Sequence, residues 1–266
     1  MDVGINNHLK KISSELLIKS KSLTGINIAR SIDSITKNIH THFLEDVDDV
    51  MVFGSYTRNT ILPQEFDPNS DIDILILFNC KNEKLKPESY RERLKKFALK
   101  HYERGKVIKD HPSIVVELDH INFDLIPGIF DDGVFYDSIE VPGKENDWIE
   151  TSPKEFGKSL AEANTRFNSI VKPIIRLLKY WNAVNNYPYS SSFKLEKMIS
   201  ELNFSGENCQ SGFFYAIDKL ETWDHSDIVK QKVQSLQRTV DHIKKFLDHE
   251  DLIGAKRMVS KIFPNF

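Results

Sequence analysis

Apolar positions near the start of the chain recur at steps of three and four residues, the spacing that places side chains on one face of an α-helix. Two series show it, from Ile5 to Leu17 and from Ile28 to Phe43. Thr24-Gly25 lies between them and predicts a break. The chain therefore opens with two amphipathic helices.

A pattern typical of β-strands follows. The short apolar runs are Val50–Phe53, Asp71–Phe78, Ser113–Leu118 and Ile121–Ile126, and Asp119-His120 joins the last two as a tight corner. Between the second and third runs, apolar residues from Tyr90 to Tyr102 predict an amphipathic helix that stops at Gly105. These elements predict a small sheet with a helix inserted into it.

After Pro142-Gly143 the pattern becomes helical to the end of the chain. Pro153 is expected in the first turn of a helix, a position where proline loses no hydrogen bond. Further helical segments are Ile170–Trp181, Val229–Leu247 and Leu252–Phe263. The separation of sheet and helices predicts an α+β fold, with a first domain over residues 1–150 and a helical domain over residues 151–266.

Composition narrows the range of partners. Of 266 residues, 40% are hydrophobic and 28% are charged, which is typical of a globular protein. The net charge of −3 gives no reason to expect nucleic acid as the main ligand. No apolar run is long enough to cross a bilayer and the first residues lack the apolar core of a signal peptide, so we expect a cytoplasmic protein without a membrane partner.

Asp71 and Asp73 are the first candidates for chemistry. Alternate side chains of a strand point to the same face, so these two carboxylates project together while Ile72 faces the core. Two such carboxylates repel each other unless a cation lies between them, and Mg²⁺ prefers hard oxygen ligands. The alternative is a pair of solvent-facing residues at a strand start, since Asp-x-Asp is a common sequence.

Two neighbouring features favour the metal. Gly54 ends the preceding strand and Ser55 offers a hydroxyl and an amide beside it, a cradle for phosphate, although Ser55 is also a good helix N-cap. Asp124 is a lone charge within an apolar strand and needs a metal or a partner such as a lysine. Three acids from two strands can hold two cations roughly 4 Å apart, as in phosphoryl transfer.

Gly54-Ser55, Asp71-x-Asp73 and Asp124 resemble the signature of the polymerase-β-type nucleotidyltransferase superfamily. Within it, Gly54–Ile61, Phe123–Pro127, Arg176–Asn182, Ser192–Glu196 and Ala255–Phe266 are similar to the bacterial cGAS/DncV-like nucleotidyltransferases (CD-NTases), the second-messenger oligonucleotide or dinucleotide synthetases. The resemblance implies a nucleotidyltransferase core over residues 1–150, the helical domain over residues 151–266, and an active site in the cleft between them. This sequence departs from the family's pattern at Asn59-Thr60, where the family often has Gly-Thr. The loop can keep a similar backbone because asparagine tolerates left-handed angles.

The resemblance also implies roles for single residues. Asp71, Asp73 and Asp124 would bind two Mg²⁺ ions, with Mn²⁺ as an alternative, and Asp124 would favour deprotonation of the attacking ribose hydroxyl. Ser55, Lys179 and Ser192 would contact the triphosphate, and Gly54 would allow its close approach. In isolation, the commoner interpretation of Lys179 is a lysine whose head reaches solvent, and the commoner interpretation of Ser192 is a turn former.

The function implied is synthesis of a cyclic or short linear oligonucleotide messenger from nucleoside triphosphates, with release of pyrophosphate, in antiphage defence. A protein activator or a downstream effector of the product would be the partner. Two alternatives stay open. One is nucleotidyl transfer to an RNA 3′ end or a small molecule, and the other is a nucleotide-binding regulatory module without turnover.

Overall fold

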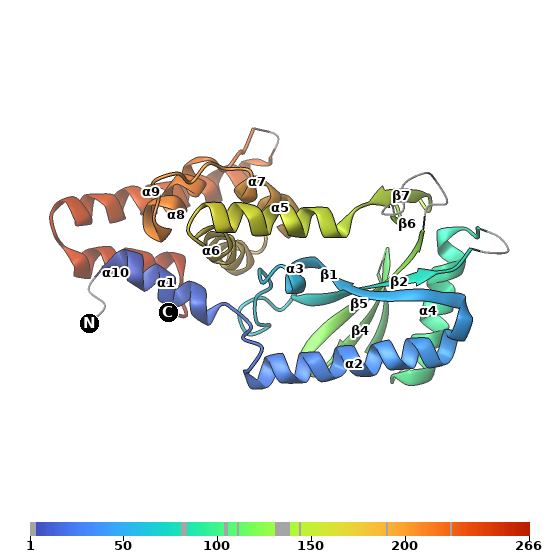
Figure 1. The fold of residues 1–266 in the computed structure, drawn as a ribbon. Coiled ribbons are helices and arrows are strands. Elements are labelled where there is room, and N and C mark those ends of the chain that lie inside the picture. Colours follow the sequence, from blue (N-terminus) through green and yellow to red (C-terminus); the bar gives the residue numbers. More distant parts are fainter. Residues whose placement is uncertain are drawn as a thin grey trace. The chain divides into compact units, whose positions relative to one another are not determined.

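The computed structural model describes residues 4–80, 84–103, 106–110, 112–130, 139–143, 145–189, 191–223 and 225–266, with the backbone alone at positions 109 and 110. Its elements form two compact units. We call Ile18–Gln64 with Asn69–Lys158 the sheet unit. The described residues up to Leu17, Glu65–Pro68 and Ser159–Phe266 form the helical unit (Figure 1).

The sheet unit contains a mixed sheet in the order β1-β2-β5-β4-β3, extended by β6 and β7 from β5. Only β2 and β5 pair in parallel; the other described pairs are antiparallel. The bounds are β1 Val47–Phe53, β2 Asp71–Phe78, β3 Val107–Asp110, β4 Ser113–Leu118, β5 Ile121–Phe130, β6 Ile139–Pro142 and β7 Trp148–Thr151.

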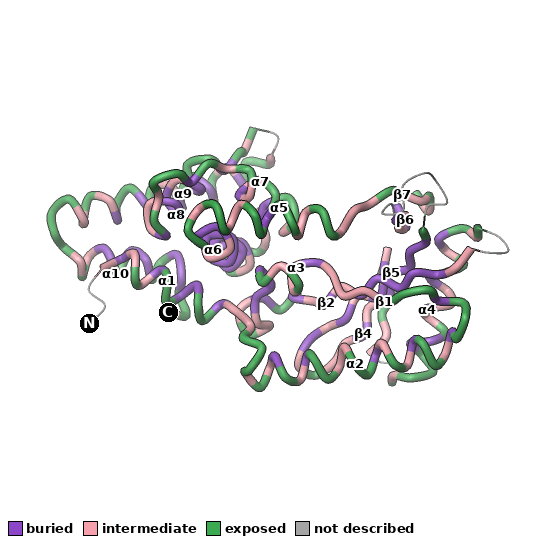
Figure 2. The backbone as a smooth tube through the Cα atoms, in the orientation of Figure 1, coloured by how far each residue is buried: buried purple, intermediate pink, exposed green. Residues whose placement is uncertain are grey.

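The two faces of this sheet differ in their cover. On one face, α2 (Leu23–Phe43) and α4 (Pro87–His101) pack against alternate residues of β2, β4 and β5 and form the larger apolar core. The other face carries a smaller cluster around Leu75, Leu77 and Ile139. In Figure 2, β2 is buried along most of its length, which matches its nearly unbroken apolar sequence.

The helical unit is built around α6 (Val171–Val184), which has buried residues on most of its surface. The helices α1, α7 and α8 pack on it, and α9 packs on α8 and α10. Their bounds are α1 Ile5–Glu15, α7 Ser192–Ser200, α8 Cys209–Asp218, α9 Asp227–Asp248 and α10 Leu252–Ile262. Over the described residues, no helix combines the length and the apolar character that crossing a membrane requires.

Many predicted elements are confirmed. The run Asp71–Phe78 forms β2 with those bounds, and Leu118 pairs with Ile121 across the predicted corner. Pro153 begins α5 (Pro153–Arg166) as expected. The α+β fold class is confirmed as well, since a mixed sheet and its covering helices precede a helical region.

Two expectations were wrong. The chain is not helical directly after Gly143, because β7 pairs with β6. The first break precedes Thr24-Gly25: Ser22 caps α2, and Gly25 lies in its first turn, where a Cβ would come within 2.3 Å of the Lys19 carbonyl oxygen. The sequence patterns also did not delimit β3, β6 and β7, and they gave no separate bounds for α7 and α8 within the predicted helical region. Gly105, the predicted helix stop, lies outside the described residues, and α4 ends at His101.

The division of the chain differs from the predicted one at residue 150. The contact boundary falls within α5, between Lys158 and Ser159, and α1 belongs to the helical unit. The helix α1 is held there by its buried apolar side chains Ile5, Leu9 and Ile12 and by a buried polar anchor. Arg176 of α6 donates from Nε to the Ser13 carbonyl oxygen (3.0 Å) and from Nη2 to Ser13 Oγ (3.1 Å). Burial lowers the pKa of Arg176 to about 10, so the guanidinium stays charged at neutral pH.

This anchor yields a stability prediction. Ser13→Ala removes one acceptor from a buried cation, so we expect the free energy of unfolding to fall by about 1–2 kcal/mol. Ser14→Ala is the matched control, because Ser14 is exposed on the same helix. Urea unfolding of both variants measures the difference. Equal midpoints would show that the Ser13 hydroxyl contributes nothing to holding α1.

Candidate active site

The three predicted carboxylates project from one face of the sheet. The parallel pairing of β2 with β5 sets Asp73 beside Asp124 and Asp71 beside Asn122. Register partners on adjacent strands share a face, and so do residues two apart on one strand. The intervening residues of both strands are buried in the larger core on the opposite face. The sheet therefore gathers Asp71, Asp73 and Asp124, each half-buried, at one place.

Gly54 gives the Asp73 carboxylate its room. Phe53 pairs with Asp73 across β1 and β2, and Gly54 follows directly with a φ of +75°, in the left-handed region. A Cβ on Gly54 would lie 1.7 Å from Asp73 Oδ2 and 2.6 Å from its Cγ. Both the backbone angle and this contact exclude a side chain, so the backbone at Gly54 lies directly against a carboxylate of the candidate site.

Ser55 lies inside the short helix α3 (Gly54–Thr57), not at its N-cap, which is Phe53. The capping interpretation is therefore wrong. Its carbonyl oxygen accepts from the backbone N–H groups of Thr60 (3.0 Å) and Ile61 (3.1 Å), which closes the loop after α3. Asn59 adopts a φ of +59°, the left-handed conformation anticipated for it. The loop keeps its turn without the glycine frequent in similar proteins.

A hydroxyl that the sequence patterns did not single out contacts the third carboxylate. Ser113, buried at the start of β4, donates from Oγ to Asp124 Oδ2 at 3.1 Å. Ser113 reads as an ordinary strand residue in the sequence, and only the antiparallel β4–β5 register brings it to Asp124. The bond fixes one oxygen of the carboxylate and stabilises its ionised form.

The donor set suits a hard cation by its chemistry. It consists of carboxylate oxygens, the ligands that Mg²⁺ prefers, and no thiol takes part. With the side chains placed as they are, the described residues include no group of three or more His, Cys, Asp or Glu close enough to hold an ion. The strand register thus supplies the ligands on one face, and the assignment of a metal to them is a proposal.

Lys179 and Ser192 lie in the helical unit. Lys179 Nζ is 3.1 Å from Glu196 Oε1, and the two side chains are only 5% and 1% exposed. The lysine therefore does not extend its head to solvent, and that interpretation is wrong. Ser192 is the first residue of α7, half-buried, while the neighbouring Ser191 caps the helix by accepting from the Lys194 N–H. The predicted turn role thus belongs to Ser191.

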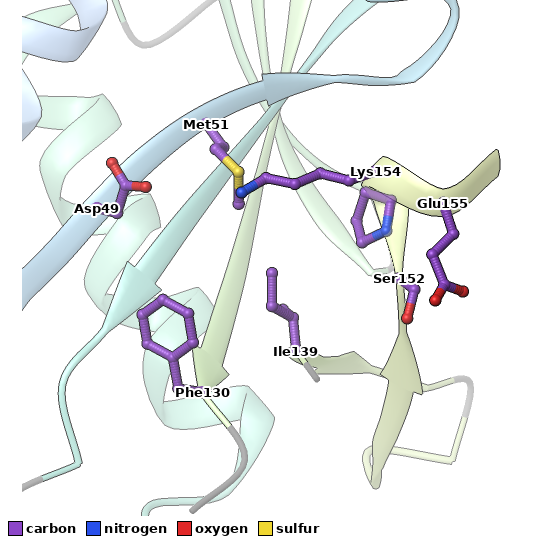
Figure 3. Close-up of a pocket in the computed structure, with 8 residues that line it drawn as sticks. Asp49, Met51, Phe130, Ile139, Ser152, Lys154 and Glu155 are labelled. Carbon is purple, nitrogen blue, oxygen red and sulfur yellow. The ribbon is translucent and has the colours of Figure 1, made fainter. Parts of the chain in front are cut away.

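A cavity of about 190 Å³ opens in the sheet unit. Figure 3 shows side chains from β1, the end of β5, β6 and the start of α5 around it, with Lys154 reaching toward Met51. The lining residues are Asp49, Met51, Phe130, Ile139, Ser152, Pro153, Lys154 and Glu155. The sequence patterns had not indicated this cavity.

Comparison with known proteins gives one family match. Residues 3–164 match the Second Messenger Oligonucleotide or Dinucleotide Synthetase domain, SMODS. The cyclic AMP-AMP-AMP synthase of an Acinetobacter strain is 24% identical over 211 residues, which is 75% of this chain and 60% of that protein. The matched part thus spans less than two thirds of the curated relative.

Solved structures share the fold over nearly the whole chain. CdnC of Escherichia coli MS115-1 with ATP has a TM-score of 0.71 at 13% identity, covering 96% of both chains. CdnG of Bradyrhizobium diazoefficiens, a CD-NTase in complex with GTP, has a TM-score of 0.69 at 12% identity, covering 96% of this chain and 97% of that one. The DncV cyclic AMP-GMP synthase of Vibrio cholerae has a TM-score of 0.64 at 16% identity, covering 98% of this chain and 80% of that one. The fold is the polymerase-β-like fold of these proteins.

We expect Gly54→Ala to destroy the candidate site. The new methyl group collides with the Asp73 carboxylate and the residue is forced into a left-handed conformation, so nucleotide-dependent activity should fall at least 100-fold. Gly157→Ala is the control: its Cβ meets nothing within 4 Å, and α5 should gain about 0.5–1 kcal/mol. Activity and thermal unfolding are measured side by side. A fully active Gly54→Ala protein would refute the close contact.

Ser113→Ala tests the bond to Asp124. Loss of a hydrogen bond from a hydroxyl to a charged carboxylate, about 1.5–3 kcal/mol, should lower turnover at least about tenfold, with little change in KM if the hydroxyl acts through Asp124. Steady-state kinetics measure the split between the two parameters, and circular dichroism checks the fold. Unchanged turnover in a folded Ser113→Ala protein would remove Ser113 from the site.

Proposed function

Because the chain belongs to the family of second messenger oligonucleotide or dinucleotide synthetases, we propose that it joins ribonucleoside triphosphates into a cyclic or short linear oligonucleotide. The observation that carries this proposal is the shared sheet face of Asp71, Asp73 and Asp124, with Gly54 against Asp73. The curated relative is named a cyclic AMP-AMP-AMP synthase, which supports the same class of reaction.

The proposed step is a nucleotidyl transfer. A ribose hydroxyl oxygen of one nucleotide forms a bond to the α-phosphorus of a second triphosphate. The bond from that phosphorus to the oxygen bridging to the β-phosphate breaks, and pyrophosphate leaves with the electron pair. The hydroxyl proton passes to the carboxylate of Asp124, which acts as general base. The Ser113 hydroxyl donates a hydrogen bond to Oδ2 of the same carboxylate and keeps it oriented.

Asp71, Asp73 and Asp124 would hold two Mg²⁺ ions, or Mn²⁺ in their place. When bound, such ions offset the negative charge on the attacking and leaving oxygens. The chain's own groups do the rest. Gly54 has no side chain, so a phosphate group can approach its backbone closely. The Ser55 hydroxyl would donate a hydrogen bond to that phosphate from the first turn of α3.

We assign Lys179 and Ser192 to the triphosphate as well. The Lys179 ammonium has three N–H donors, and its bond to Glu196 uses one of them in a setting that water barely reaches. The Ser192 hydroxyl, at the first position of α7, adds a neutral donor.

The oligonucleotide would act as a second messenger in bacterial antiphage defence, made in the cytoplasm and read by an effector. A protein activator is a second proposed partner. One of the similar solved structures is a complex of CdnC with a HORMA protein, which supports asking for such an activator here.

The test is product formation. The purified chain is incubated with labelled ATP, GTP, CTP and UTP and Mg²⁺ or Mn²⁺, treated with phosphatase, and the products are resolved. Asp71→Asn with Asp73→Asn should lower the yield of a phosphatase-resistant product by more than 1,000-fold, because an amide neither binds a divalent cation well nor carries charge. Asp241→Asn, an exposed carboxylate on α9, is the control and should be unchanged.

Other outcomes separate the alternatives. Label incorporated only when an RNA or a small alcohol is added would replace messenger synthesis by transfer to that acceptor. Nucleotide binding without pyrophosphate release, in every mixture and with both metals, would favour a regulatory module.

A further inference from the structure

We propose that Asp67 and Tyr187 are positioning residues for Asp71 and act through the short stretch of chain that joins Asp67 to β2. The proposal deepens the proposed function and rests on it, because Asp71 matters here as a ligand of the proposed metal. It draws on contacts within the helical unit, to which residues 65–68 belong, and on the register of β2.

Asp71 is the carboxylate of the β2 pair that the sheet supports least. Asp73 has a strand on each side, since it pairs with Phe53 of β1 and with Asp124 of β5. The pairing of β1 with β2 ends at Asp73, so within the described strand pairs Asp71 has only β5 beside it. The end of a strand opens more readily than its middle. The position of Asp71 therefore depends on the chain that precedes it.

That preceding chain is anchored in the helical unit. Phe66 stacks on Phe266 with ring centroids 5.1 Å apart and makes a T-shaped contact with Tyr180 at 5.8 Å. Asp67 is only 5% exposed, and its Oδ1 accepts from the Tyr187 hydroxyl at 2.5 Å. Aromatic contacts and a hydrogen bond to a buried carboxylate thus hold two successive residues.

Tyr187 is itself held in an unusual conformation. Its φ of +52° lies in the left-handed region, which a bulky residue adopts only where neighbouring contacts enforce it. The Tyr187 N–H donates to the Asn182 carbonyl oxygen at 2.8 Å. The buried Asn182 side chain exchanges two hydrogen bonds of 2.9 Å with the backbone of Tyr189. The loop after α6 therefore presents the Tyr187 hydroxyl at a fixed place.

The anchor is close enough to Asp71 to set its position. Three residues lie between Asp67 and Asp71, so even a fully extended chain spans at most about 14 Å between their Cα atoms. Pro68 has a restricted φ, and Ser70 is buried with its carbonyl oxygen accepting from Gln64 Nε2 at 3.3 Å. This short, restrained stretch passes a shift of Asp67 on to the start of β2.

A small displacement of Asp71 has a large effect on the proposed reaction. Mg²⁺ requires ligands in near-ideal octahedral geometry, and a misplacement of about 1 Å can cost on the order of 100-fold in rate. Without the Tyr187 hydroxyl, the buried Asp67 carboxylate has one hydrogen bond fewer and is stabilised by moving toward water. Loss of this hydroxyl should therefore lower turnover more than it weakens nucleotide binding.

The first experiment removes the donated hydroxyl alone. In Tyr187→Phe, kcat should fall about tenfold while KM for the nucleotides changes less than twofold. Tyr189→Phe is the matched control: its hydroxyl donates to the Glu221 carbonyl oxygen, and the substitution leaves the backbone bonds to Asn182 in place. This control should keep the wild-type kcat. A wild-type kcat in folded Tyr187→Phe would overturn the proposal.

Variants of Asp67 test whether the bond itself matters. Asp67→Asn keeps an acceptor oxygen for the tyrosine hydroxyl and should stay within threefold of the wild-type kcat, whereas Asp67→Leu should lose about tenfold. Because both residues act through one contact, Asp67→Leu combined with Tyr187→Phe should be no slower than either single variant. Equal losses in Asp67→Asn and Asp67→Leu, or losses that multiply in the double variant, would contradict the proposal.

Hydrogen exchange keeps the two proposals apart because it needs no turnover. In Tyr187→Phe, peptides that contain the start of β2 should exchange at least fivefold faster than in the wild type or in Tyr189→Phe. If no product forms in any mixture while this difference persists, the proposed synthesis fails and the anchoring of Asp71 stands. Unchanged exchange at the start of β2 in Tyr187→Phe would overturn the anchoring, even in an active enzyme.

Discussion

The site depends on the parallel pairing of β2 with β5. This register sets Asp73 next to Asp124, and the alternation along β2 adds Asp71 on the same face. Like charges this close repel, so the arrangement costs stability unless a cation or a donor offsets it. Burial of the opposite face of these strands in the larger apolar core, against α2 and α4, offsets this cost. The core therefore keeps the carboxylates close together, whereas in the unfolded chain they would move apart.

Two local devices complete the geometry. The left-handed Gly54 lets the chain turn from β1 into α3 while its backbone touches the Asp73 carboxylate. The Ser113 hydroxyl binds Asp124 from the neighbouring strand. Along the same face, Asp49 and Met51 line a cavity of about 190 Å³.

The sequence predicted the parts of the fold that follow from local pattern. The β-branched run of β2, the corner before Ile121 and the start of α5 at Pro153 all depend on neighbours in the chain. The attachment of α1 to the helical unit did not follow, because it depends on packing against α6 and α8, far away in the sequence, and on Arg176 bonding Ser13 across 163 positions. The sequence did not predict Ser113 as a partner of Asp124 or Glu196 as a partner of Lys179. Their sequence context is ordinary, and only tertiary contact shows what they bind.

The central claim is that Asp71, Asp73 and Asp124 act as one metal-binding face. It is tested most directly by anomalous diffraction from crystals of the full chain grown with Mn²⁺ and a non-hydrolysable nucleoside triphosphate. The account predicts two Mn²⁺ peaks at this face, both on Asp71 and Asp73 and one shared with Asp124. Manganese bound only elsewhere, or a triphosphate bound away from these carboxylates, would contradict it.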